Sequence, residues 1–214
     1  MTGRSFISDD TRNRVRGYAV PLATAIGRTG ITPNGLTVIG FLGAVLTAIL
    51  AGLDAWVVAG ITLLFFGAFD MLDGALARAT GRVSKFGGFL DSSLDRAGEL
   101  VIYVGIGAGA MSSGTNPVAV LASLTMAAAV MVSYTRARAE SLGFRGDVGV
   151  APRAERVALL GLGLIATGIG GGPAHGPWLA LTLGIILALS TITVLQRILV
   201  VRAQSRQSEV ESHA

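Results

Sequence analysis

Five acidic residues with regular spacing are the side chains of this sequence best suited to chemistry. Asp70 and Asp73 are three residues apart, Asp91 and Asp95 are four apart, and Glu99 follows four residues later. Residues three or four apart lie on one face of an α-helix. The link between the two acidic helices is short, so we expect them to be antiparallel neighbours whose four aspartates converge at one end of a helical bundle.

Four clustered carboxylates indicate a metal site, because they repel one another unless they are protonated or neutralised. The chain has no cysteine, and its two histidines, His175 and His213, lie far from the aspartates. A ligand set made only of oxygen atoms favours magnesium, manganese or calcium over zinc or copper. Two divalent ions would balance four charges, and ions about 4 Å apart are the usual arrangement for phosphoryl transfer.

The alternative is a charged interface in which the aspartates pair with basic residues of the same two helices. Ionisable residues at membrane depth cost several kcal/mol and are functional by default. We therefore favour the metal site. The candidate partners for the alternative are Arg78, Arg82, Lys85 and Arg96.

The composition places these helices in a membrane. The chain has 214 residues, of which 51% are hydrophobic and 14% are charged, and its mean hydropathy is +0.65. A soluble domain carries about a quarter charged residues, so a soluble protein is not expected. The apolar stretches that predict transmembrane helices are 36–53, 55–71, 89–111, 117–134, 157–170 and 178–199.

The basic residues predict the orientation in the membrane. All 17 basic residues lie in four places. They lie before the first apolar stretch, around the link between the second and third stretches, between the fourth and fifth stretches, and from the end of the sixth stretch onward. Basic residues concentrate on the cytoplasmic side. We therefore expect a multi-pass protein of the plasma membrane with both termini, and the aspartate cluster, at the cytoplasmic face.

The N-terminal segment, residues 1–30, predicts an amphipathic helix on the cytoplasmic membrane surface, in contact with membrane lipids through its arginines. A cleaved signal peptide is the alternative, but the apolar run is short, contains proline and precedes another arginine. The predicted organisation is therefore this surface segment, an all-α membrane domain of six helices over residues 31–203, and a polar tail over 204–214.

The two acidic helices together carry a longer pattern, D-x2-D-G-x2-A-R-x8-G-x3-D-x3-D, which begins at Asp70 and ends at Asp95. This pattern resembles the signature of the CDP-alcohol phosphotransferases, and its eight fixed positions all match. The resemblance implies a six-helix membrane enzyme that displaces CMP from a CDP-linked lipid when a hydroxyl of a second substrate attacks the β-phosphate.

The resemblance also implies a role for each residue that matches the signature. Asp70, Asp73, Asp91 and Asp95 would bind two Mg²⁺ ions, with Mn²⁺ as a possible substitute, and Asp95 would also accept the proton of the acceptor hydroxyl. Residues at the start of the first helix and around the signature would bind the CDP-lipid. These are Asn34, Gly35, Leu36, Thr37, Gly74, Arg78, Ser84 and Gly87.

Arginines at helix ends suggest the second substrate, because guanidinium groups recognise phosphate. Arg136, Arg153, Arg156 and Arg197 are predicted on the metal face and would form one acceptor-phosphate pocket. This set resembles that of the bacterial phosphatidylinositol phosphate synthases, although lysine often replaces Arg136 there. The resemblance implies CDP-diacylglycerol and inositol 1-phosphate as substrates and a homodimer.

Three alternatives remain at this point. A phosphatidylglycerophosphate synthase would use glycerol 3-phosphate, which is also a phosphate ester. An ion-coupled transporter would place its acidic site nearer the membrane midplane. A structural membrane protein would not need four aspartates in register. No nucleic-acid partner is expected.

Overall fold

The computed structural model describes residues 31–69, 72, 76–78, 81, 83–150 and 152–212, the last five of them as backbone alone. The predicted surface helix at residues 1–30 lies outside this part of the chain, as do Asp70, Asp73 and Gly74. The accounts below concern the described residues.

Six long helices make up most of the described chain, which contains no strand. Each predicted apolar stretch overlaps one of them. Three, α2, α6 and residues 178–207 of α8, are long and apolar enough to cross a membrane, and α3 is a shorter apolar helix. The helices are α2 (Pro33–Gly52), α3 (Trp56–Gly67), α5 (Lys85–Ser112), α6 (Asn116–Ser141), α7 (Arg153–Ile169) and α8 (Trp178–Ser212).

Two of the helix limits differ from the sequence prediction. α3 ends at Gly67, four residues before the predicted end of the second stretch. α8 continues as a helix to Ser212, so residues 204–212 extend the last helix instead of forming a separate tail. Gln204 explains part of this extension, because its side-chain amide donates to the carbonyl oxygen of Arg145 and accepts from the amide of the same residue.

Side-chain caps set the starts of the two helices that carry the predicted nucleotide residues. The hydroxyl of Thr32 accepts a hydrogen bond from the amide of Gly35 at 3.1 Å, and proline occupies the first position of α2. The hydroxyl of Ser84 accepts from the amide of Gly87 at 2.9 Å at the start of α5. Such caps satisfy amides that have no partner inside the helix.

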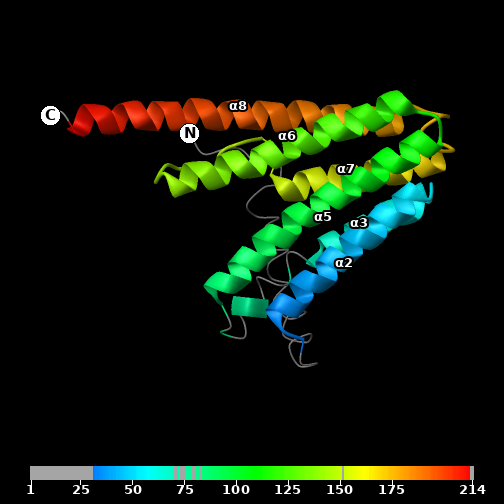
Figure 1. Ribbon diagram of the computed structural model, residues 1–214, viewed down its shortest axis with the longest axis horizontal. Helices are drawn as coiled ribbons and strands as arrows, with labels where there is room; N and C mark the ends of the chain where they lie inside the picture. Colours follow the sequence, from blue (N-terminus) through cyan, green and yellow to red (C-terminus); the bar gives the residue numbers. More distant parts are fainter. Residues whose placement is uncertain are drawn as a thin grey trace, which may run out of the picture.

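The helices form two arms that meet at one end of the molecule (Figure 1). α2 packs along α5 in one arm and α6 packs along α8 in the other, while α5–α6 and α3–α7 contacts join the arms. The turns after α2, α5 and α7 lie at the joined end, and the C-terminal end of α8 lies at the open end (Figure 1). The open end therefore corresponds to the predicted cytoplasmic face.

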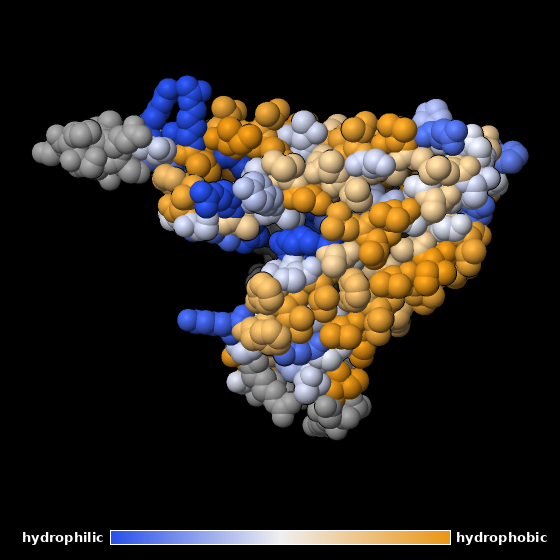
Figure 2. All heavy atoms as spheres, viewed as in Figure 1, coloured by the Kyte–Doolittle hydropathy of each residue, from blue (hydrophilic) through white to orange (hydrophobic). Residues whose placement is uncertain are grey.

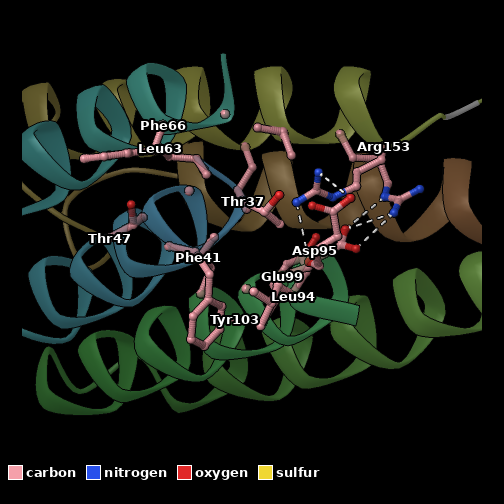
Figure 3. A pocket seen from close by; sticks show the side chains of 18 residues that line it. Thr37, Phe41, Thr47, Leu63, Phe66, Leu94, Asp95, Glu99, Tyr103 and Arg153 are labelled. Atoms are coloured by element: carbon pink, nitrogen blue, oxygen red, sulfur yellow. Dashed lines mark hydrogen bonds and ion pairs between the residues drawn. The ribbon is translucent and has the colours of Figure 1, made fainter. Parts of the chain in front are cut away.

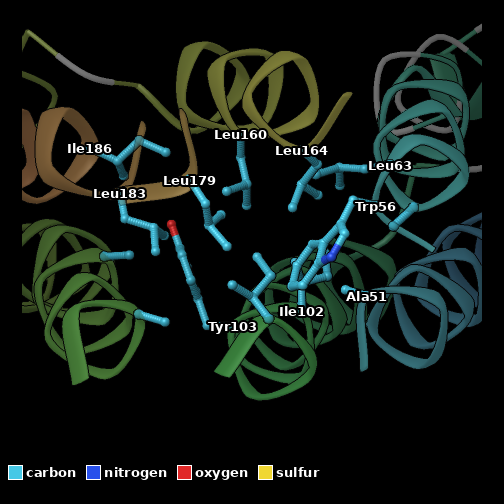
Figure 4. Packing of buried hydrophobic residues seen from close by; sticks show 14 residues of the cluster. Ala51, Trp56, Leu63, Ile102, Tyr103, Leu160, Leu164, Leu179, Leu183 and Ile186 are labelled. Atoms are coloured by element: carbon cyan, nitrogen blue, oxygen red, sulfur yellow. The ribbon is translucent and has the colours of Figure 1, made fainter. Parts of the chain in front are cut away.

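The buried core lies where the arms meet. Trp56, Ile102, Tyr103, Leu164 and Leu183 belong to one cluster that draws on α3, α5, α7 and α8 (Figure 4). Many large apolar side chains remain exposed on the outside of the helices, as the orange surface in Figure 2 shows. Contiguous exposed apolar surface marks contact with lipid or another protein, and here it agrees with a membrane location.

Glycines allow α2 and α5 to pack closely. A Cβ atom on Gly105 would lie 2.6 Å from the Cα atom of Ala48, and one on Gly109 would lie 2.2 Å from the carbonyl oxygen of Ala51. Both residues are buried. These two glycines serve helix packing, because small residues let helix backbones approach one another in membranes.

Candidate active site

The predicted nucleotide residues gather around one cavity near the start of α2. It has a volume of about 300 Å³ and lies between the first turn of α2, residues 77–78 and the first turns of α5. Five of the eight predicted CDP-lipid residues line it, together with one predicted metal ligand. These are Asn34, Thr37, Arg78, Ser84, Gly87 and Asp91.

Two of the remaining predicted nucleotide residues, Gly35 and Leu36, do not line this cavity. Leu36 is buried against Leu72 and Leu76 in a small apolar cluster, so its side chain does not line the cavity. Gly35 contributes its amide to the helix cap, and Gly74 lies outside the described residues. The cluster around Leu36 holds Leu72 and Leu76 against the start of α2.

Gly87 brings two of the lining residues together. A Cβ atom at this position would lie 3.0 Å from the hydroxyl oxygen of Ser84 and 3.1 Å from the side-chain carbonyl oxygen of Asn34. Both distances are shorter than ordinary van der Waals contacts. Glycine therefore allows α2 and α5 to approach one another at the cavity wall.

The functional residues of α5 form one stripe. Gly87, Asp91, Asp95 and Glu99 follow one another at intervals of four residues, so they lie along one side of the helix. At 1.5 Å per residue the stripe is about 18 Å long. It begins at the nucleotide cavity and ends at two ion pairs with α7.

Asp91 is a suitable metal ligand in this structure. Its carboxylate lines the nucleotide cavity, and within the described residues it forms no ion pair with Arg78, Lys85 or Arg96. Arg96 instead donates to the carbonyl oxygen of Ser92 in its own helix. The charged-interface alternative therefore finds no support at Asp91 among these three described partners, and its fourth candidate, Arg82, lies outside the described residues.

The four predicted metal ligands are not all described, so the site is seen in part. The described residues contain no group of three acidic or histidine side chains that would enclose an ion, since Asp70 and Asp73 lie outside them. The part that is seen fits a hard divalent cation, because Asp91 offers carboxylate oxygen at a cavity wall and such cations prefer oxygen ligands.

Asp95 and Glu99 each bind an arginine of α7 (Figure 3). The Nη1 atom of Arg153 lies 3.1 Å from a carboxylate oxygen of Asp95. Arg156 binds Glu99 through Nε at 3.2 Å and through Nη2 at 3.0 and 3.2 Å. Both ion pairs border an internal cavity of about 40 Å³, which is large enough for water.

Thr37 connects the two cavities, because it lines the internal cavity as well as the nucleotide cavity. Asp91 and Asp95, one turn apart on α5, line one cavity each. Figure 2 shows hydrophilic atoms in the hollow between the arms, beside the hydrophobic outer surface of the helices. A reacting phosphate at the nucleotide cavity would therefore be close to the arginines of α7.

The four predicted acceptor arginines lie near one another but do not line a single cavity. Arg153 and Arg156 border the internal cavity, whereas Arg136 lines a separate cavity of about 350 Å³ between α6 and the loop that follows it. Arg197 is within electrostatic range of Arg136 and Arg156. It donates to the carbonyl oxygens of Val148, at 2.8 Å, and Val132.

Arg197 and Arg136 each have protein partners of their own in this structure. Arg197 is buried and ties α6 to the loop before α7 through two backbone carbonyl groups. Arg136 is half-exposed and pairs with Glu140 at 2.8 Å. No sequence pattern marks a backbone carbonyl group as the partner of an arginine. The hydrogen bonds of Arg197 could therefore not be predicted from the sequence.

Comparison with known proteins assigns the family. The model of the CDP-alcohol phosphatidyltransferases matches residues 30–200. The chain belongs to the CDP-alcohol phosphatidyltransferase family. The phosphatidylinositol phosphate synthase of Cutibacterium acnes is 37% identical over 85% of this chain and 91% of that protein. The archaetidylinositol phosphate synthase of Pyrococcus horikoshii is 39% identical over 87% of this chain and 92% of that protein.

Solved structures agree with this assignment. The crystal structure of the phosphatidylinositol phosphate synthase of Mycobacterium tuberculosis with CDP-DAG bound matches with a TM-score of 0.76 at 30% identity, over 86% of this chain and 92% of that one. The same protein is also known in complex with manganese and citrate, with a TM-score of 0.75. The predicted all-helical membrane fold is confirmed.

Membership of this family shows that the chain is an enzyme of phospholipid biosynthesis. The transporter and the structural membrane protein are therefore set aside. A divalent metal is part of the family's chemistry, as the manganese complex illustrates.

Proposed function

We propose that this enzyme transfers the phosphatidyl group of CDP-diacylglycerol to a hydroxyl of inositol 1-phosphate, with release of CMP. The observation that carries the proposal is the stripe on α5. It leads from the cavity lined by Asn34, Arg78 and Ser84 to the arginine pair of α7. A nucleotide site and a phosphate site thus lie at the two ends of one row of acidic residues.

On the donor side, Asn34, Thr37 and Ser84 offer hydroxyl and amide groups to the cytidine phosphate, and Arg78 offers a positive charge. We infer that Asp70, Asp73, Asp91 and Asp95 hold two Mg²⁺ ions. When bound, such ions neutralise the pyrophosphate and the leaving CMP. The inference rests on the signature spacing and on the position of Asp91 at the cavity.

On the acceptor side, Asp95 takes the proton of the attacking hydroxyl, and the arginines hold the acceptor's phosphate. Arg153 is the more accessible of the α7 pair, with 30% of its side chain exposed against 2% for Arg156. Arginine binds phosphate through two parallel hydrogen bonds. Arg153 pairs with Asp95. An acceptor whose phosphate is held by Arg153 would therefore have a hydroxyl of its own near the base, Asp95.

Inositol phosphate is favoured over glycerol 3-phosphate as the acceptor. The relatives from Cutibacterium acnes and Pyrococcus horikoshii differ in the lipid part of their names, yet both names specify inositol phosphate. The arginine set alone would suit either phosphate ester, so glycerol 3-phosphate remains the second candidate.

The deciding experiment supplies the purified enzyme with CDP-diacylglycerol and magnesium and measures CMP. The acceptors are inositol 1-phosphate, glycerol 3-phosphate, inositol and serine, each added alone. We expect CMP release with inositol 1-phosphate and little with unphosphorylated inositol. Faster release with glycerol 3-phosphate would replace the proposed acceptor, and release with serine alone would contradict the phosphate pocket.

We also propose that all six helices cross the plasma membrane, with both termini cytoplasmic, and that the enzyme works as a homodimer. The sorting of the basic residues supports the orientation. The exposed apolar surface of the helices supports contact with lipid or a second copy.

A further inference from the structure

Glu99 is a buried acidic residue that lies outside the signature motif, which ends at Asp95. Its residue is 9% exposed, and its partner Arg156 is 3% exposed. Three hydrogen bonds of 3.0–3.2 Å join the two side chains. Removing a charge from water is costly unless it is paired and hydrogen-bonded, so Glu99 provides the charge that allows Arg156 to be buried.

The pair bridges two helices whose backbones lie apart and which only side chains, among them the Asp95–Arg153 pair, bring into contact. No Cα atom of α5 lies within 8 Å of a Cα atom of α7. The internal cavity lies between these helices. Backbone packing therefore does not set where the guanidinium of Arg156 stands relative to α5, and its bonds to Glu99 do.

The neighbouring pair differs from this one. Asp95 and Arg153 form an ion pair between partly exposed side chains, Arg153 also donates to the backbone carbonyl oxygen of Asp95, and Asp95 already has a proposed part in the chemistry. Arg153 and Arg156 lie one turn apart on α7, and their like charges act on one another. The negative charge of Glu99, which binds Arg156, offsets this repulsion between the two guanidinium groups.

We propose that Glu99 is a positioning residue for the phosphate of the acceptor substrate. It orients Arg156 beside Arg153, so that the two guanidinium groups receive a phosphate monoester together. Glu99 touches neither substrate. The proposal rests on the proposed function, because it assumes that the acceptor carries a phosphate.

The first variant is Glu99→Gln, which keeps the shape and one acceptor oxygen but removes the charge. We expect the KM for inositol 1-phosphate to rise about tenfold, as for one weakened charged hydrogen bond. The KM for CDP-diacylglycerol and kcat should stay within about twofold. Asp54→Asn is the matched control, because Asp54 bonds Ser112 and Ser113 at the opposite end of α5, and it should leave both constants unchanged.

The second variant separates positioning from stability. The double change Glu99→Arg with Arg156→Glu restores an ion pair between α5 and α7 but moves the guanidinium to the other helix. We expect it to recover the thermal midpoint lost in Arg156→Glu alone, while the KM for inositol 1-phosphate stays raised. Recovery of both quantities would show that the pair is only structural and would overturn the proposal.

A third variant covers the case in which these proteins do not fold. Glu99→Asp keeps the charge on a side chain one methylene shorter, and we expect it to raise the KM for inositol 1-phosphate but less than Glu99→Gln. An unchanged KM in folded Glu99→Asp and Glu99→Gln would overturn the proposal. Absence of turnover with inositol 1-phosphate in the wild-type enzyme would instead contradict the proposed function itself.

Discussion

Asp95 has two different surroundings, and they define what this side chain can do. It follows Asp91 by one turn on α5, and it binds Arg153 of α7. The first neighbour belongs to the nucleotide cavity and the second to the proposed acceptor site. A base between these two places can accept a proton from the acceptor as the phosphorus–oxygen bond forms.

Replacing Asp95 by asparagine should therefore abolish CMP release while the protein still folds. The amide oxygen of asparagine still accepts a hydrogen bond from Arg153, but the amide cannot take up a proton. CMP is measured in detergent with excess magnesium, and folding is checked by gel filtration and circular dichroism. Turnover close to the wild-type rate would remove Asp95 from the role of base.

Gly87 allows a second prediction about a single side chain. In Gly87→Ala the new methyl group would press on Asn34 and Ser84. We expect the KM for CDP-diacylglycerol to rise severalfold, since both neighbours line the nucleotide cavity, and the KM for the acceptor to change little. Gly107→Ala on the same helix is the control, because a Cβ atom there meets nothing within 4 Å. Equal kinetics for the two variants would contradict this account of Gly87.

α5 is the helix that links the parts of the site. Its 28 residues carry the acidic stripe at one end and the packing glycines at the other. Its close contact with α2 also holds the nucleotide residues of both helices at one cavity. The distance between these helices therefore decides whether Asn34 and Gly87 meet.

Enlarging Gly105 tests this dependence. In Gly105→Val the side chain would overlap the backbone of Ala48, which cannot move aside as a flexible side chain can. We expect a loss of about 2 kcal/mol in the free energy of unfolding. Thermal or denaturant unfolding of the protein in detergent measures this loss. Gly107→Val, which meets open space in the structure, should unfold within about 0.5 kcal/mol of the wild type.

The two arms and their connecting turns define two ends of the molecule. The turn between α7 and α8 lies at the joined end, and the C-terminal end of α6 lies towards the open end (Figure 1). The positive-inside pattern predicts that the open end faces the cytoplasm. The absence of cysteine from the chain makes this orientation simple to test, since no native thiol reacts.

Single cysteines at Ala174 and Ser141 should report opposite sides of the membrane. Both residues are exposed, one in the turn before α8 and the other at the end of α6. In intact cells a membrane-impermeant maleimide should label Ala174→Cys, and it should label Ser141→Cys only after permeabilisation. The reverse pattern would invert the proposed topology.

Much of the fold and half of the site follow from local patterns. The caps at Thr32 and Ser84 and the apolar stretches mark the helices, because capping and hydropathy depend on residues close in the sequence. The spacing of Asp91 and Asp95 places them on one face for the same reason. Five of the eight predicted nucleotide residues meet at one cavity, and four of them belong to the starts of α2 and α5.

The partners of the arginines required the folded chain. Arg153 and Arg156 meet acids 58 and 57 residues away, and Arg197 meets carbonyl groups 49 and 65 residues away. Side-chain types and spacing along one helix determine which residues share a face, but they do not specify which face of a distant helix lies opposite. That choice depends on how α5, α6, α7 and α8 pack together, and it places Arg153 and Arg156 at one cavity and Arg136 at another.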